Sequence, residues 1–246
     1  MSDHRPAAGI RGVGLDLAYS GTVVVHAAGV ELLAGRITAL VGPNGSGKST
    51  LLRALARLHR PSAGQVLLGD GSDALALSSR DFARRVTMLA QSRPVPTGIS
   101  VHDVVGFGRH PYRRRWREGD PDGPDVIAHA MAVTGVADLA ERSVDSLSGG
   151  QLQRVWLASC LAQDTAVLLL DEPTTYLDLR YQVEILDLVR DLADESRRRH
   201  GRRAGRPGRA HPGLRRAARR AALGGGRHRR GAAGVHRVVR LSLIHI

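Results

Sequence analysis

The residues best suited to chemistry surround Lys48, the single lysine in a chain with 36 basic residues. The stretch from Gly42 to Thr50 reads GPNGSGKST and fits the phosphate-binding pattern G-x-x-x-x-G-K-[ST] in full. Glycines let backbone N–H groups converge on phosphate oxygens, the compact ammonium reaches the β- and γ-phosphates, and the Ser49 hydroxyl can ligate Mg²⁺. The residues that we predict to bind ATP here are Gly42, Pro43, Asn44, Gly45, Ser46, Gly47, Lys48, Ser49 and Thr50.

The segments on either side of this loop have the patterns of a strand and a helix. Residues 37–41 form a short apolar run typical of a buried strand. The leucines between Leu51 and Leu58 fall on one face of a helix that should end before Pro61. Strand, glycine loop and helix therefore follow in the order that phosphate binding requires, which a chance glycine-rich turn with a lysine would not explain.

Two carboxylates follow a second apolar strand. Residues 166–170 read AVLLL and lead into Asp171 and Glu172, which places both acids at the carboxyl edge of a parallel sheet, beside the glycine loop. One acid can hold Mg²⁺ through its water shell, and the other can accept a proton from a water that attacks the γ-phosphate. We assign Asp171 to Mg²⁺ and Glu172 to the base. Without the glycine loop, an acidic turn after a strand would carry no such meaning.

A third motif, LSGGQ at residues 147–151, precedes a helical run through Ala162. With the glycine loop and the two acids, it resembles the signature of the ATP-binding subunits of ABC transporters. The resemblance implies that the motif contacts the γ-phosphate of ATP held by a second subunit, and a helix N-terminus does favour an anion. A Ser-Gly-Gly turn that only caps a helix is the alternative, but it does not explain the order of the motifs. The residues concerned are Ser148, Gly149, Gly150 and Gln151.

The resemblance implies roles for three further residues. Tyr19 stands where the family stacks an aromatic ring on adenine, although a half-buried strand tyrosine is the alternative. Gln91 follows the strand-like residues 86–90 and matches the glutamine that contacts Mg²⁺ and the attacking water, with Ala90 where proline is expected. Asp178 matches the aspartate that crosses the interface of the dimer.

The region of about residues 92–150 has helical patterns interrupted by proline and glycine, and we interpret it as an inserted helical subdomain that docks the membrane partner. Its residues 104–113 read VVGFGRHPYR and resemble a stretch of the importers for ferric siderophores, haem and cobalamin. We expect Arg109 and Arg113 to face the permease. The alternative for the arginines at 113–115 is a solvated run of charge.

The predicted fold class is α/β: a P-loop core with a parallel sheet, an N-terminal antiparallel β-subdomain and the helical subdomain, all within residues 1–195. The length of 246 residues suits one sizeable domain or two small ones, and a single cysteine excludes a disulfide scaffold. No stretch approaches the roughly 18 apolar residues of a membrane span, and the N-terminus does not read as a secretory signal. We expect a cytoplasmic protein, peripheral on the inner face of the cell membrane.

The formal charge of +13 comes from residues 196–246, because sixteen arginines lie between Arg197 and Arg240. Residues 1–195 carry 20 basic and 23 acidic side chains, so the body is not that of a nucleic-acid binder. The family has a buried strand here, ending in a histidine that contacts the γ-phosphate, which would fall near position 205. The tail is too charged and too rich in glycine for such a strand.

Two hypotheses address the tail. It could be a disordered, arginine-rich arm for nucleic acid or anionic lipid. It could also be translated out of frame, because residues 241–246, LSLIHI, can be encoded by a transposon end used in building sequencing libraries. We favour the second hypothesis, and therefore expect a disordered or non-native tail, a sheet that lacks one strand, and impaired turnover.

The sequence thus predicts the ATP-binding and hydrolysing subunit of an ABC importer for an iron-siderophore or similar chelate. The expected partners are a second ATP-binding subunit in a homodimer, transmembrane permease subunits and, indirectly, an extracytoplasmic substrate-binding protein, with no nucleic acid. One alternative is a soluble ABC-type ATPase in DNA repair or translation, which should carry a long coiled coil or a second cassette. Another is a nucleotide-binding fragment without turnover.

Overall fold

The computed structural model describes the chain except at residues 1–7, 92, 114–119, 174–181, 193, 195–240 and 246. The described residues fall into two compact units. Of the described residues, the first unit comprises 8–91, 93, 165–173, 182–192, 194 and 241–245, and the second comprises 94–113 and 120–164. Among the described residues, no helix has the length and apolar character needed to cross a membrane.

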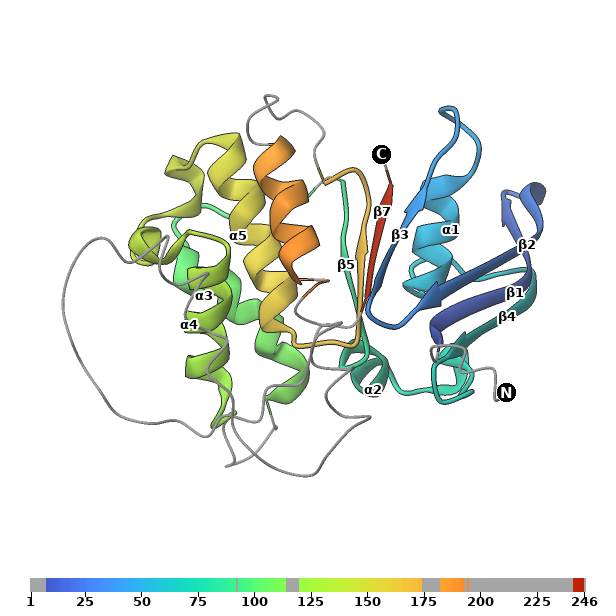
Figure 1. The fold of residues 1–246 in the computed structure, drawn as a ribbon, viewed down its shortest axis with the longest axis horizontal. Coiled ribbons are helices and arrows are strands. Elements are labelled where there is room, and N and C mark those ends of the chain that lie inside the picture. Colours follow the sequence, from blue (N-terminus) through green and yellow to red (C-terminus); the bar gives the residue numbers. More distant parts are fainter. Residues whose placement is uncertain are drawn as a thin grey trace. The chain divides into compact units, whose positions relative to one another are not determined.

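An antiparallel sheet of order β2-β1-β4 forms one part of the first unit (Figure 1). Its strands are β1 (Ala8–Tyr19), β2 (Thr22–Leu33) and β4 (Ala63–Leu68). The hairpin between β1 and β2 turns at Ser20 and Gly21, both with positive φ, as a two-residue turn that matches the twist of the strands requires. Tyr19 pairs with Thr22 and therefore occupies the tip of this hairpin.

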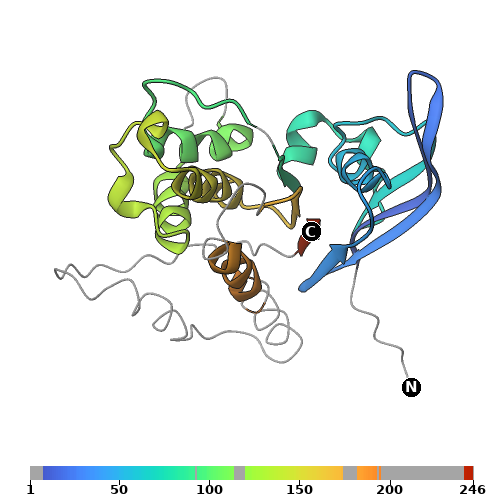
Figure 2. The ribbon, with the colours of Figure 1, turned by 90° about the horizontal axis from the view of Figure 1, so that it is seen from above.

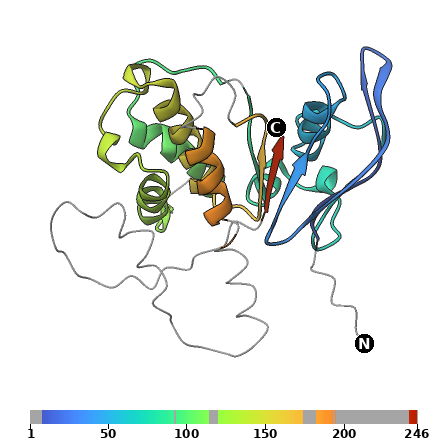
Figure 3. The ribbon, with the colours of Figure 1, turned by 45° about the horizontal axis from the view of Figure 1, so that its top comes forward.

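A parallel sheet of order β3-β7-β6-β5 forms the other part. Its strands are β3 (Arg36–Leu40), β5 (Val86–Leu89), β6 (Val167–Leu170) and β7 (Leu241–His245). Helix α1 (Lys48–Leu55) and the helical residues 182–192 lie on opposite faces of this sheet (Figure 3). Every residue of β5 and β6 is buried, as expected for strands covered on both faces. The predicted strands around the glycine loop and before the acids are thus confirmed.

The prediction that this sheet lacks a strand is wrong. The backbone of β7 pairs in parallel with β3, where Leu40 is opposite His245, and with β6, where Leu170 is opposite Ile244. A gap between β3 and β6 would leave peptide N–H and C=O groups unpaired on both, and β7 supplies the partners. The part of the tail at 195–240, including position 205, lies outside the described residues.

Helix α1 is shorter than the leucine pattern predicted. Leu52 and Leu55 are fully buried, but the helix ends at Leu55. Arg57 then adopts a φ of 59°, which turns the chain out of the helix. Leu58, predicted on the buried face, is consequently 66% exposed.

The second unit is helical (Figure 2). Its helices are α3 (Val101–Gly106), η2 (Phe107–Tyr112), α4 (Gly123–Val133), η3 (Ala137–Leu139), η4 (Val144–Ser146) and α5 (Gly149–Ala162). This unit extends to Asp164 and so includes all of α5, beyond the expected range of 92–150. The first unit also holds two short helices, η1 (Ala74–Ala76) and α2 (Ser79–Ala83).

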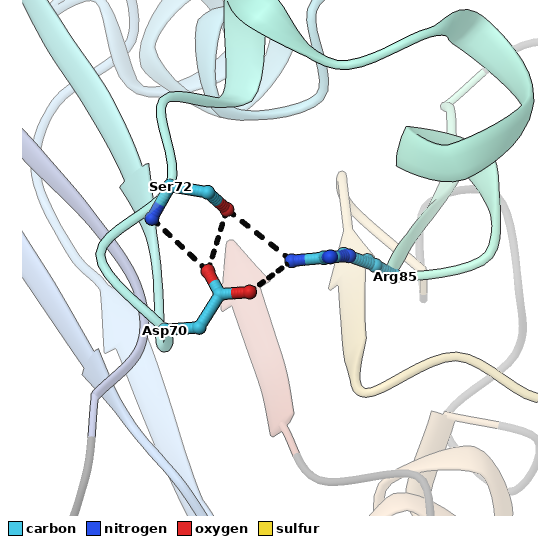
Figure 4. Close-up of polar contacts among 3 residues, drawn as sticks. All are labelled: Asp70, Ser72 and Arg85. Carbon is cyan, nitrogen blue, oxygen red and sulfur yellow. Dashed lines mark hydrogen bonds and ion pairs between the residues drawn. The ribbon is translucent and has the colours of Figure 1, made fainter.

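A polar cluster of Asp70, Ser72 and Arg85 ties the turn after β4 to the residue that precedes β5 (Figure 4). The Asp70 carboxylate accepts hydrogen bonds from the Ser72 hydroxyl at 2.5 Å and the Ser72 N–H at 3.0 Å. Its other oxygen lies 2.5 Å from Arg85 Nη1. These hydrogen bonds, first from the Ser72 side chain and backbone and then from Arg85, lower the pKa of Asp70 from 3.8 to about 2.

The lowered pKa of Asp70 predicts an acid-dependent loss of stability. The charged carboxylate stabilises the fold above its unfolded pKa near 4, and this contribution is lost as the pH falls toward the folded value of about 2. The Asp70→Asn variant should therefore unfold at lower urea at pH 7, and its stability should fall less steeply than that of the parent between pH 4 and pH 2. Asp138→Asn, at an exposed position on η3, is the control. Parallel curves for parent and Asp70→Asn would contradict the assignment.

Candidate nucleotide-binding site

The glycine loop links β3 to the first residue of α1, so the unpaired N–H groups of the helix N-terminus face the loop. Gly47 combines a φ of 85° with a close approach of β2, because a Cβ added there would lie 2.4 Å from Val25 Cγ2. Only glycine satisfies both conditions. The loop is therefore fixed against the β-subdomain on one side and α1 on the other.

The Lys48 ammonium lies over its own loop. Nζ donates to the carbonyl oxygens of Gly42 at 2.7 Å and Pro43 at 2.6 Å, and to Ser46 Oγ at 3.3 Å. All three donors of the ammonium are thus directed at oxygen acceptors. This geometry places a positive charge where phosphate oxygens can take the place of the loop carbonyls.

A cavity of about 310 Å³ opens above the loop. It gathers residues from the end of β1, from β2, from the loop and α1, and from the segment after β6. They are Tyr19, Val24, Asn44, Gly45, Gly47, Lys48, Ser49, Thr50 and Glu172. Val24 is the member that sequence reasoning missed, since the pattern of its strand does not show which loop the strand approaches.

The two residues predicted to hold Mg²⁺ are in direct contact. Ser49 Oγ donates to Asp171 Oδ1 at 2.9 Å, although the residues are far apart in the sequence. Asp171 is fully buried at the carboxyl end of β6. A hydroxyl and a carboxylate are hard oxygen ligands of the kind that Mg²⁺ prefers beside phosphate oxygens, so this pair fits a magnesium–nucleotide complex.

Glu172 and Gln91 also lie together. Gln91 Nε2 donates to Glu172 Oε2 at 2.5 Å. The register of the strands explains this contact, because Leu89 at the end of β5 is opposite Leu170 at the end of β6. Glu172 has a φ of 47°, which is strained for a residue with a side chain. The backbone therefore turns sharply at the residue that we predict to be the base, and its side chain lines the cavity.

The LSGGQ motif lies in the second unit, at the N-terminus of α5, as predicted. Ser148 Oγ accepts from the Gln151 N–H at 3.3 Å, and Gln151 Oε1 accepts from the Ser148 N–H at 3.0 Å. This reciprocal pair is a capping box, so the alternative interpretation as a cap is also true. Ser148 and Gly149 are exposed, and the N-terminus of a helix of 14 residues is open to an anion. Asp178 lies outside the described residues.

Arg109 is not the exposed docking residue that we predicted. Its side chain is 5% exposed and pairs through Nε with Asp120 Oδ2 at 2.6 Å, while Nη2 donates to Asp120 Oδ1 at 2.9 Å. Nη1 donates at 3.0 Å to the carbonyl of Ala162, the last residue of α5. Burial, the largest single effect, lowers the pKa of Arg109, but the hydrogen bonds and charge of Asp120 together raise it above its ordinary value.

The neighbours of Arg109 show that η2 packs closely against the C-terminal end of α5. A Cβ added at Gly108 would lie 2.1 Å from the Ser159 carbonyl oxygen, so only glycine permits this approach. The guanidinium of Arg109 also stacks 3.9 Å from the centre of the Tyr112 ring. Arg109 therefore caps the C-terminus of α5 and links it to Asp120, whereas Arg113 is exposed.

The fold and the site define a P-loop nucleotide-binding protein with an antiparallel β-subdomain and a helical unit that carries a second anion-favouring helix N-terminus. Residues 25–175 match the ABC transporter family, and the chain belongs to that family. It is an ABC-type ATPase.

Two named transport proteins align with about three quarters of this chain. The ferric enterobactin transport ATP-binding protein FepC of Escherichia coli (strain K12) is 46% identical over 189 residues, which are 76% of this chain and 68% of FepC. The cobalamin import ATP-binding protein BtuD of Halobacterium salinarum is 47% identical over 185 residues, 75% of this chain and 46% of BtuD. The chain spans about two thirds of the length of FepC.

Two solved structures are similar in fold. One is a metal-chelate type ABC transporter in an inward-facing conformation, with a TM-score of 0.64 and 30% identity over 76% of this chain and 68% of that one. The other is cbiO1 from Clostridium perfringens, part of the transporter complex cbiONQ, with a TM-score of 0.67 and 27% identity over 77% of this chain and 75% of that one.

The buried ion pair predicts that Arg109→Ala destabilises the second unit strongly. Removing one partner leaves the Asp120 carboxylate uncompensated, which costs about 3–5 kcal/mol. Urea unfolding followed by hydrogen exchange in α4 and α5 measures this loss. Arg142→Ala is the control, since the side chain of that exposed arginine makes two hydrogen bonds of 3.3 Å, both to Ser146, among the described residues. The double variant Arg109→Ala/Asp120→Ala should lose less than the sum of the single losses, and simple additivity would contradict a coupled pair.

Proposed function

We propose that this chain is the ATP-binding and hydrolysing subunit of an importer for an iron-siderophore or a similar metal chelate. The observation that carries the catalytic part is the meeting of Lys48, the Ser49–Asp171 pair and the Gln91–Glu172 pair around one cavity. The identities with FepC and BtuD, whose names specify ferric enterobactin and cobalamin, support the transport part.

ATP would bind with its phosphates over the glycine loop. The loop carbonyls that now hold Lys48 Nζ would give way to β- and γ-phosphate oxygens, and the backbone N–H groups at the start of α1 would donate to the same anion. Tyr19 lies at the edge of the cavity, and the exposed face of its ring would stack on the adenine of ATP.

Ser49 and Asp171 would hold Mg²⁺, and Gln91 would complete its surroundings. The ion supplies positive charge that neutralises the phosphates as the bond to the γ-phosphate breaks. Since Ser49 Oγ and Asp171 Oδ1 already lie 2.9 Å apart, the side chains need little rearrangement to share one cation.

Glu172 would accept the proton of the attacking water. Its carboxylate lines the cavity, and the Gln91 amide donates to Oε2 and so fixes the orientation of the carboxylate. Gln91 would orient the base, and the strained backbone at Glu172 keeps the carboxylate at the edge of the sheet.

A second copy of the chain would complete the site. The N-terminus of α5, where Ser148 and Gly149 are exposed and Gly150 and Gln151 follow, has the dipole and donor groups to contact the γ-phosphate bound by the other copy. Asp178 would lie at the interface of this homodimer. ATP binding would then close the dimer, and hydrolysis would open it.

The dimer would drive permease subunits from the cytoplasmic side of the membrane, with an extracytoplasmic protein delivering the chelate. Because Arg109 is buried, docking would fall to exposed neighbours on the same segment. Phe107 is 50% exposed, and Arg113 lies at the end of η2. An exposed aromatic ring beside a cation is a suitable anchor for a protein partner.

Replacing Lys48 should abolish nucleotide binding. Lys48→Ala removes the charged donor directed at the β- and γ-phosphates, and we expect ATP–Mg²⁺ affinity to fall at least about 100-fold. Lys48→Arg is the sharper companion, because a planar guanidinium does not fit the three acceptors of the loop and should also bind poorly. Calorimetric titration measures all three proteins, and equal affinities would refute the site.

Replacing Glu172 should separate binding from hydrolysis. Glu172→Gln keeps the shape of the side chain but cannot accept a proton, so ATP affinity should persist while the hydrolysis rate falls about 10²- to 10⁴-fold. ATP-dependent dimers should accumulate and can be measured by light scattering. A variant that hydrolyses ATP as fast as its parent would exclude Glu172 as the base. A parent that binds ATP without hydrolysing it would favour the fragment without turnover.

A further inference from the structure

Tyr19, which lines the cavity, contacts the ring of a second residue. The rings of Tyr19 and His59 have centroids 4.6 Å apart and planes tilted by 40°. Tyr19 lines the cavity and is 44% exposed, so this contact covers part of its ring and leaves the rest accessible. No sequence motif singles out His59.

The end of α1 fixes the position of His59. The chain leaves the helix through the positive φ of Arg57, and the Arg53 carbonyl then accepts from both the Leu58 N–H at 2.8 Å and the His59 N–H at 3.1 Å. Since α1 has eight residues, its length is roughly 12 Å. One short helix thus carries the phosphate-binding lysine at its first residue and is followed directly by the ring that contacts Tyr19.

Hydrogen bonding does not explain the placement of the imidazole. Its Nε2 is buried and has no hydrogen-bond partner among the described residues. Among the described residues, the imidazole ring contacts the ring of Tyr19, and the two ring planes are tilted by 40°. The imidazole ring packs against the Tyr19 ring and so restricts the rotation of Tyr19, and tilted aromatic pairs at this distance attract one another.

We propose that His59 is a positioning residue for the nucleotide base: it holds the Tyr19 ring so that the opposite face receives the purine. The inference rests on the proposed binding of ATP in this cavity. His59 acts only through Tyr19 and does not touch the phosphates. Because stacking recognises a flat ring rather than a hydrogen-bonding edge, the pair would favour ATP and GTP alike over ligands that lack a base.

The test compares ATP, GTP and inorganic tripolyphosphate, each with Mg²⁺, by calorimetric titration of the full chain. His59→Leu removes the flat ring, and we expect ATP and GTP affinities to fall about 2- to 10-fold, the range for one aromatic pair, with tripolyphosphate affinity unchanged. His59→Phe restores a ring and should bind ATP like the parent. His102→Leu, at an exposed histidine of the second unit, is the matched control.

A thermodynamic cycle with Tyr19 separates positioning from a general structural role. Tyr19→Leu should lose more ATP affinity than His59→Leu, and the double variant should equal Tyr19→Leu, since His59 acts through that ring. Additive losses, an equal loss for tripolyphosphate, or no loss at all would each overturn the proposal. If His59→Leu does not fold by circular dichroism, His59→Gln replaces it. Lys48→Ala should lose all three ligands; if it binds them normally, the proposed site fails whatever His59 does.

Discussion

The parallel pairing of β3, β7, β6 and β5 is the constraint on which the rest of the site depends. The polar residues of the cavity other than Tyr19 come from the segments that follow two of these strands: Asn44, Lys48, Ser49 and Thr50 from the loop and α1 after β3, and Glu172 from the turn after β6. Leu40 is opposite His245, Ile244 opposite Leu170, and Leu170 opposite Leu89, so the ends lie level. The ladder even continues into the site, because the Asp171 N–H donates to the Leu89 carbonyl. Backbone pairing, rather than side-chain attraction, therefore brings together the glycine loop and the residues that we propose hold Mg²⁺ and act as the base.

The same ladder gives the last described strand its importance. Since β7 separates β3 from β6, those two strands lie roughly 10 Å apart, two strand spacings. Ser49 Oγ nevertheless donates to Asp171 Oδ1 at 2.9 Å, so the loop after β3 and the first turn of α1 bring Ser49 to the end of β6. Without a strand in that place, β3 and β6 would move together and the contact would change. Central strands of a parallel sheet are typically apolar. Three of the five residues of LSLIH are Leu or Ile, whereas the arginine-rich sequence before it does not have this pattern, and LSLIH lies where a different strand was expected.

Local motifs were predictable and distant contacts were not. The glycine loop, the acids after a buried strand and the capping box of Ser148 each depend on neighbours within a few residues, so their spacing identifies them. Arg109 was misjudged because its partners, Asp120 and the end of α5, come from other segments, and a charge pattern alone does not distinguish a docking surface from a buried pair. Leu58 was misjudged because a positive φ at Arg57 has no reliable signal in an arginine. The position of β7 was not predicted because it depends on pairing with β3 and β6, which are distant from it in the sequence.

The chemistry of the signature explains why its contact with a nucleotide would be reversible in the proposed dimer. LSGGQ contains no charged side chain, and the Ser148 oxygen already accepts from the Gln151 N–H. Its attraction for phosphate thus comes mainly from backbone N–H groups and a helix dipole equivalent to about half a charge, which fades within one turn. Such a contact is strong only when the γ-phosphate is close. A lysine in its place would hold ADP and phosphate as well, because a full charge acts over a longer distance. In the proposed cycle the lysine lies instead in the glycine loop, where the nucleotide would stay bound, and the weaker contact lies where the dimer would open.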